Sequence, residues 1–96
     1  MFEIRRGDQG EIILVGRFDA AQADAARELF GGIDRGVTVD FLKLEYISSM
    51  GLGVLLETQK RLRAAKAGGL RLVNVNRPIQ DILRFSGFHQ IFEIEG

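Results

Sequence analysis

One stretch, residues 46–56, constrains the fold most, because it passes from an apolar strand pattern to a periodic helix pattern with only two serines between them. Ser48 and Ser49 stand at this junction, where their oxygens can accept hydrogen bonds from the first free N–H groups of the helix. An exposed serine at the positive end of a helix also suits a phosphate group. Gly51 and Gly53 each cost a helix about 1 kcal/mol relative to alanine, which indicates close approach of another group to the backbone.

The remainder of the chain alternates strand and helix patterns. Residues 2–6 and 11–15 are expected to form an antiparallel hairpin around a loop rich in Gly and Asp. The later expected elements are a helix at 20–30, a strand at 37–44, a helix at 49–67, a strand at 70–75, a helix that Asn76 begins and Gly87 ends, and a strand at 91–94. This alternation predicts βαβ units. The expected fold class is α/β, a mixed and mostly parallel sheet of about five strands with three helices, in a single domain covering residues 1–96.

Two acidic residues need a reason for their positions. Asp19 precedes Gln22 by three residues, the spacing of a capping box at the start of a helix. Asp40 lies in a run of apolar residues so dense that we expect its strand to be covered on both faces. Asp40 is either near the end of that strand and hydrated, or it makes a hydrogen bond that orients the turn containing Ser48 and Ser49.

Composition excludes several functional classes. Thirteen basic residues balance thirteen acidic residues, so we expect no nucleic-acid partner. The chain has no cysteine and one histidine, which argues against a metal site, and no cofactor is expected. No apolar run reaches the ~18 residues of a membrane span, and the first residues resemble no signal peptide. We therefore expect no membrane insertion and a cytoplasmic location.

No enzymatic motif is present. The sequence has no phosphate-binding loop, no dinucleotide fingerprint and no Gly-x-Ser-x-Gly elbow. His89 is the sole imidazole, and a catalytic histidine needs a nucleophile and an orienting group that the chain does not offer. We therefore expect a protein that is not an enzyme.

Residues 40–56 resemble the signature segment of STAS domains, specifically that of bacterial anti-sigma factor antagonists. Residues 16–19, reading Gly-Arg-Phe-Asp, are similar to the segment that precedes the first helix in that family. Gly68 and Gly69 before a strand, and then residues 84–88, are similar to its later segments. The resemblance covers nearly the whole chain, with its pieces in the order and at the spacing of the family.

The resemblance implies a regulatory role in transcription through partner switching. In that family, an anti-sigma factor that is also a serine kinase phosphorylates a serine at the strand-to-helix turn, and only the unphosphorylated form binds this partner and releases the sigma factor. Ser49 is the matching position. Ser48 stands where the family commonly has Asp, which leaves a second candidate hydroxyl, so Ser48 is the alternative. The residues expected to bind the partner are Asp19, Ser48, Ser49, Met50, Gly51 and Gly53.

Two further expectations follow from the resemblance. A STAS subunit can instead dock on a lipid or anion transporter without phosphorylation, which is the alternative function. Family members usually continue from the last strand into another helix, which this sequence lacks. Either that helix is dispensable, or apolar residues such as Ile91 and Phe92 are covered by a second chain in a homodimer.

Overall fold

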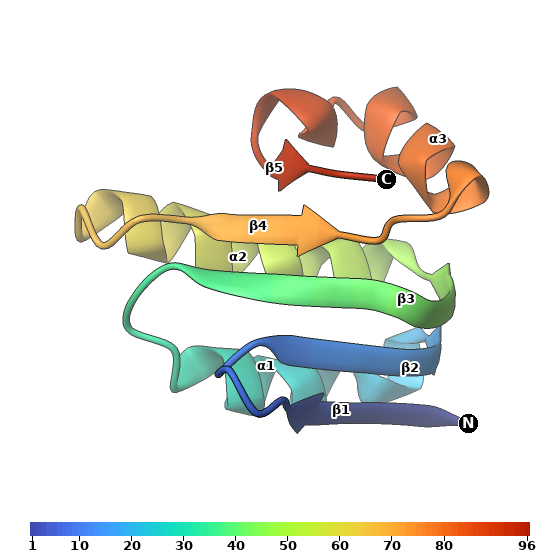
Figure 1. Ribbon diagram of the computed structural model, residues 1–96, viewed down its shortest axis with the longest axis horizontal. Helices are drawn as coiled ribbons and strands as arrows, with labels where there is room; N and C mark the ends of the chain where they lie inside the picture. Colours follow the sequence, from blue (N-terminus) through green and yellow to red (C-terminus); the bar gives the residue numbers. More distant parts are fainter.

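A five-stranded sheet with strand order β1-β2-β3-β4-β5 organises the computed structural model, which describes residues 1–96 (Figure 1). The strands are β1 (Phe2–Arg6), β2 (Ile12–Phe18), β3 (Val37–Ile47), β4 (Leu70–Val73) and β5 (Glu93–Ile94). β1 pairs antiparallel with β2, and the other neighbouring strands pair in parallel. The mixed, mostly parallel α/β sheet expected from the sequence is confirmed.

The helices connect these strands. They are η1 (Ala20–Gln22), α1 (Ala23–Gly31), α2 (Ser49–Ala64), α3 (Arg77–Phe85) and η2 (Phe88–Gln90), where η denotes a short 3-10 helix. In Figure 1, α1 and α2 both lie behind the sheet, whereas α3 and η2 lie beyond β4. The core lies between the sheet and α1 and α2, and α3 adds Ile79 and Leu83 to it; its fully buried residues include Phe18, Phe41 and Leu55.

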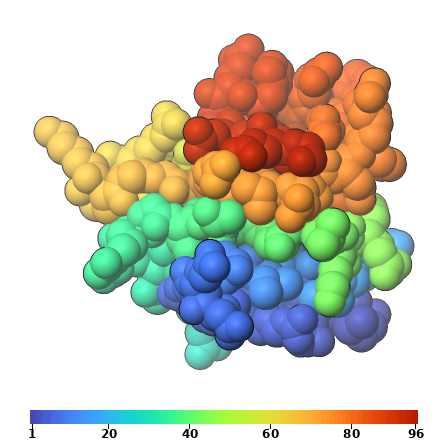
Figure 2. Space-filling view, viewed as in Figure 1, coloured from blue at the N-terminus to red at the C-terminus, as the bar shows by residue number.

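The sheet is covered on one face only, so the expectation that residues 37–44 are covered on both faces is wrong. Along β3, Val39, Phe41 and Leu44 are buried, while Leu42 is 67% exposed. The chain moves in one direction from β2 through β3 to β4, and right-handed crossovers therefore place both connecting helices on the same side. Figure 2 shows the uncovered face of the strands.

Two strands are longer than the sequence predicts. β2 continues through Gly16 and Arg17, which we expected to end it, and β3 continues to Ile47. Gly16 has a positive φ of +88°, and a Cβ there would lie 2.2 Å from the carbonyl oxygen of Met1. The pairing of β2 with β3 shifts register twice, next to Ile13 and next to Gly16. These irregularities interrupt the alternation of buried and exposed residues, so a prediction from strict alternation ends both strands too early.

Asp40 lies inside β3 and not near its end, but it is partly exposed, so the expected hydration is confirmed, whereas the expected hydrogen bond to the serine turn is not found. Its Oδ1 accepts hydrogen bonds from the backbone N–H of Leu42 at 2.9 Å and from Nδ2 of Asn74 at 3.0 Å. Leu42 is at the irregular position of the strand, where the pairing with β2 shifts register. The carboxylate therefore bonds to β3 and to the residue after β4, not to the turn containing Ser48 and Ser49.

Gln59, a buried polar residue of α2, connects the helix to the starts of the parallel strands β4 and β5. Its Oε1 accepts a hydrogen bond from the N–H of Leu70 at 2.7 Å, and its Nε2 donates to the carbonyl of Ile91 at 2.8 Å. The helix ends at Ala64, three residues earlier than expected, and Lys66 has a positive φ of +55°. A left-handed residue ends the helix before Gly68 is reached.

The C-terminal part follows the predicted order with a shorter last strand. Asn76 caps α3 by accepting a hydrogen bond from the N–H of Ile79 at 3.0 Å, as its position predicts. Gly87 follows the helix with φ of +76°. Phe92 is 4% exposed and Ile91 is half-buried. Phe92 therefore needs no second chain to cover it, whereas Ile91 stays partly exposed and the homodimer stays a prediction.

Candidate functional site

The turn between β3 and α2 is fixed by backbone and side-chain hydrogen bonds that use Ser48. Its N–H donates to the carbonyl of Phe18 at 2.9 Å, which ties the turn to the end of β2. Its Oγ accepts from the N–H of Gly51 at 3.2 Å, so Ser48 is the N-cap of α2. Ser48 is also half-buried. The capping role expected of the serine pair thus belongs to Ser48.

Ser49 is the first residue of α2 and has a different environment. Its side chain is exposed, and its hydroxyl makes no hydrogen bond within the protein. The neighbouring Met50 is 49% exposed. The backbone N–H groups at this end of the helix give it a partial positive charge. Ser49 therefore offers an accessible hydroxyl in a position that tolerates an added negative group.

The two glycines of the first turns differ in their surroundings. Gly51 is buried, and a Cβ there would lie 2.9 Å from Cγ1 of Ile47 and 3.0 Å from Cγ of Phe18. At Gly53, a Cβ would meet no atom within 4 Å. Close packing of α2 on β2 and β3 explains Gly51, whereas only Gly53 presents bare backbone to an outside molecule.

Asp19 lies at the same edge of the sheet, because it follows Phe18 at the end of β2. Its N–H donates to Oε1 of Gln22 at 2.9 Å, which is one half of the predicted capping box. Its Oδ2 lies 3.8 Å from Nε of Arg17. The structure thus brings Asp19, Ser48 and Ser49 together, although they are about 30 residues apart in sequence.

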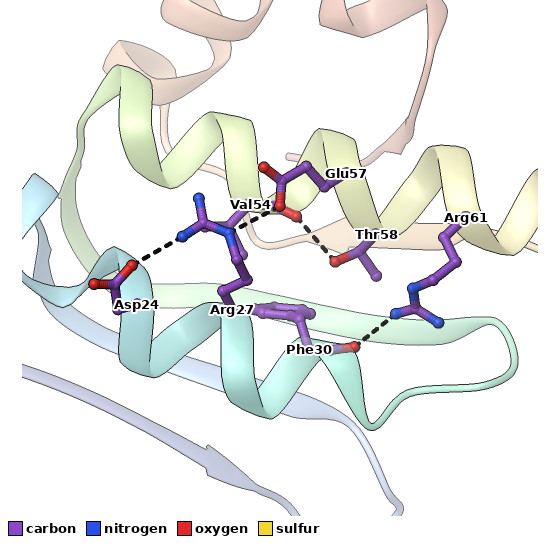
Figure 3. Close-up of polar contacts among 7 residues, drawn as sticks. All are labelled: Asp24, Arg27, Phe30, Val54, Glu57, Thr58 and Arg61. Atoms are coloured by element: carbon purple, nitrogen blue, oxygen red, sulfur yellow. Dashed lines mark hydrogen bonds and ion pairs between the residues drawn. The ribbon is translucent and has the colours of Figure 1, made fainter.

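A charged group on the adjacent helix surface connects α1 to α2 (Figure 3). Arg27 donates from Nε to Glu57 at 2.9 Å and from NH1 to Asp24 at 3.0 Å. The hydrogen bond and charge of Glu57, with a smaller contribution from Asp24, raise the pKa of Arg27 above its ordinary value. Glu57 lies two turns after Ser49 on α2, so the network borders the surface around Gly53.

Figure 3 also shows one hydrogen bond within α2 and one that joins α2 to α1. Thr58 is buried, and its hydroxyl donates to the carbonyl of Val54 at 2.9 Å. Arg61 donates to the carbonyls of Phe30 and Ile33, both at 2.8 Å. These carbonyls belong to the C-terminal end of α1 and the loop after it, where a cation is favourable. The contacts of Arg27 and Arg61 therefore join the two helices that flank the candidate site.

The rest of the surface shows no cluster of residues typical of a metal or catalytic site. No three His, Asp or Glu side chains converge in a way that could hold a metal ion. His89 is exposed in η2. None of the helices has the length and apolar character needed to cross a bilayer. The largest hollow, about 810 Å³, lies at the opposite end of the strands, where acidic and basic side chains alternate around it: Arg6, Glu11, Asp34, Arg35, Arg71 and Glu93.

Sequence reasoning missed the polar residues that border the turn. Arg17 lies over the ring of Tyr46, with Cζ 4.4 Å from the ring centroid. The two residues are opposite each other in the β2–β3 register. Both lie within motifs noted in the sequence, residues 16–19 and 40–56, but their contact depends on a register with two shifts. Only the folded sheet brings them together.

Comparison with known proteins places this arrangement in a family. A family model described as STAS domain matches residues 8–96. A Bordetella bronchiseptica protein described as an anti-sigma factor antagonist, BtrV, is 36% identical over 84 residues, which cover 84% of this chain and 70% of that protein.

Solved structures agree on the fold. An anti-sigma factor antagonist from Mycobacterium paratuberculosis has a TM-score of 0.81 at 19% identity, covering 99% of this chain and 84% of that one. The Bacillus cell fate determinant SpoIIAA in its phosphorylated form has a TM-score of 0.68 at 18% identity, covering 98% of this chain and 90% of that one. The chain therefore belongs to the STAS-domain family, among the anti-sigma factor antagonists.

Proposed function

We propose that this protein is a phosphorylation-controlled anti-sigma factor antagonist. Its unphosphorylated form binds an anti-sigma factor with serine kinase activity and thereby releases the sigma factor. Phosphorylation of Ser49 by that partner ends the binding. The protein acts as a binding partner without catalysis of its own, in the cytoplasm, where sigma factors and their regulators act.

The observation that carries the proposal is the contrast between the two serines. Ser49 is exposed with a free hydroxyl, whereas Ser48 is half-buried with its oxygen engaged by Gly51. Modification of Ser48 would cost the helix its cap, whereas modification of Ser49 would cost no contact within the protein. This supports Ser49 over Ser48 as the phosphorylated residue.

The docking surface comprises the fully or partly exposed groups around that hydroxyl. We define it as Asp19, Ser48, Ser49, Met50 and Gly53. Met50 supplies an adaptable apolar side chain that is 49% exposed. Gly53 leaves room for a partner atom against the backbone. Gly51 is excluded from this surface because it is buried.

The physical basis of the switch is local. A phosphate adds about −1.5 to −2 charges at neutral pH and a bulky hydrated group in the middle of the docking surface. The start of α2 tolerates this charge because the helix dipole favours an anion there. The partner then meets a charged group that it would have to desolvate. The free protein needs no refolding for its binding to be lost.

A pair of variants at one position separates charge from shape. Ser49→Asp and Ser49→Asn are nearly isosteric and differ by a negative charge. Each variant and the wild type are immobilised, and their capture of the cognate anti-sigma factor from host extract is measured. We expect Ser49→Asn to capture the partner and Ser49→Asp to lose most of it. Ser49→Ala should bind the partner and accept no phosphate from it.

Three results would contradict the proposal. Equal capture by Ser49→Asp and Ser49→Asn would show that charge at this position does not control binding. Phosphopeptides that map to Ser48 in the wild type, or continued phosphorylation of the Ser49→Ala variant, would move the modification elsewhere. Capture of a transport protein by wild type and Ser49→Asp alike would support the alternative function of a transporter-docking subunit.

A further inference from the structure

Arg17 lies beside the candidate site and makes only two weak contacts, one with an aromatic ring and one with a carboxylate. Its Cζ stacks 4.4 Å from the centroid of the Tyr46 ring on the uncovered face of the sheet. Its ion pair with Asp19 is long, at 3.8 Å, and its side chain is 52% exposed. An exposed ion pair of this length contributes little, and a stacked guanidinium still has donors free for an anion.

The turn with the two serines is tied to the end of the strand that carries this side chain, and α2 continues from it behind the sheet. Ser48 donates its N–H to the carbonyl of Phe18, the residue that follows Arg17. One interstrand hydrogen bond and one peptide unit on each strand therefore separate Arg17 from Ser49. Standard backbone dimensions put their Cα atoms roughly 10–14 Å apart. A long arginine side chain and a phosphoserine side chain together span a distance of this order.

On the basis of the phosphorylation proposed above, we propose that Arg17 binds the phosphate on Ser49 and leaves the ring of Tyr46 when it does so. A phosphate carries more charge than the carboxylate of Asp19 and offers three acceptor oxygens that a guanidinium can bind in bidentate fashion. The ring can offer only a cation–π contact, which is weaker at an exposed site. Phosphorylation therefore moves Arg17 from one partner to the other.

This movement gives phosphorylation a second effect on the docking surface. The phosphate introduces negative charge at Ser49, and it also withdraws a basic side chain from the edge next to Asp19. The ring of Tyr46 becomes uncovered at the same time. A partner that contacts this edge would thus meet a different charge pattern and a different apolar surface, with the backbone unchanged.

The chain contains an intrinsic reporter of this movement. Tyr46 is its only tyrosine, and it has no tryptophan, so tyrosine emission reports on this ring alone. Phosphoserine is incorporated at position 49 during translation, which removes any need for the kinase. Tyrosine emission is then compared between phosphorylated and unmodified protein, in the wild type and in Arg17→Gln. Tyr46→Phe is the control for background emission, and far-UV circular dichroism checks that each variant is folded.

We expect phosphorylation to shift wild-type emission most of the way to that of unmodified Arg17→Gln, and to leave Arg17→Gln unchanged. Arg17→Lys should respond less than the wild type, because an ammonium group lacks the bidentate geometry. High salt should reduce the wild-type response.

The inference is overturned if phosphorylation leaves wild-type emission unchanged, or if it changes emission equally in Arg17→Gln. Partner capture by the phosphorylated protein is measured separately. Lost capture with unchanged emission would retain the proposed function and reject the role of Arg17. An emission shift with retained capture would support Arg17 as the phosphate ligand and contradict the proposed switch.

Discussion

Replacing Gly53 and Gly51 by alanine, one at a time, tests whether the glycines of α2 serve docking or packing. Alanine stabilises the interior of a helix by about 0.5–1 kcal/mol relative to glycine. At Gly53 nothing opposes this gain, because a Cβ there meets no atom within 4 Å. Gly53→Ala should therefore raise the free energy of unfolding by about 0.5–1 kcal/mol.

Gly51→Ala should have the opposite sign. Its Cβ would lie 2.9 Å from Cγ1 of Ile47 and 3.0 Å from Cγ of Phe18, both in the core. Overpacking of this kind costs about 1–3 kcal/mol, of which the helix propensity returns about 1 kcal/mol. The net expectation is a loss of up to about 2 kcal/mol. The two chemically identical substitutions should thus differ by about 1–3 kcal/mol.

Urea unfolding followed by circular dichroism at 222 nm measures both values. Calorimetric titration with the cognate anti-sigma factor then measures binding. A methyl group inserted at Gly53 into a close contact should weaken binding about tenfold, which corresponds to about 1.4 kcal/mol, in a variant that is more stable than the wild type. Equal stability changes in the two variants would refute the packing argument. Unchanged affinity in Gly53→Ala would refute its place in the docking surface.

Three other predictions concern residues around the same helix. Ser48→Ala should lower the free energy of unfolding by about 1 kcal/mol through loss of the helix cap, and Ser49→Ala should change it by less than about 0.5 kcal/mol, both measured in urea. Gln59→Leu should cost about 1–3 kcal/mol, because it leaves the buried N–H of Leu70 without a partner, whereas the carbonyl of Ile91 still accepts from Arg63; no loss of stability would show that water replaces the amide. The coupling between Arg27 and Glu57, from a double-mutant cycle, should fall between low and high salt, since both side chains are exposed; a salt-independent value would contradict this.

Much of the fold could be predicted from local patterns. The hairpin, the alternation of strands and helices and the cap at Asn76 all depend on residues close in sequence. The Ser48–Ser49 pair was placed correctly for the same reason, since caps and glycine positions are local features. Strand ends were less accurate: β3 extends three residues beyond the expected 44, because its register shifts disturb the alternation.

The sequence by itself determined the order of elements, the two candidate hydroxyls and the family resemblance, because these depend on short-range preferences. Only the tertiary structure decided that one face of the sheet stays uncovered, and that Gly51 packs on Phe18 while Gly53 faces outward. It also decided that Arg17 lies over Tyr46. The handedness of crossovers, the strand register and the helix orientation set these contacts. They join residues far apart in the chain, and no local pattern encodes them.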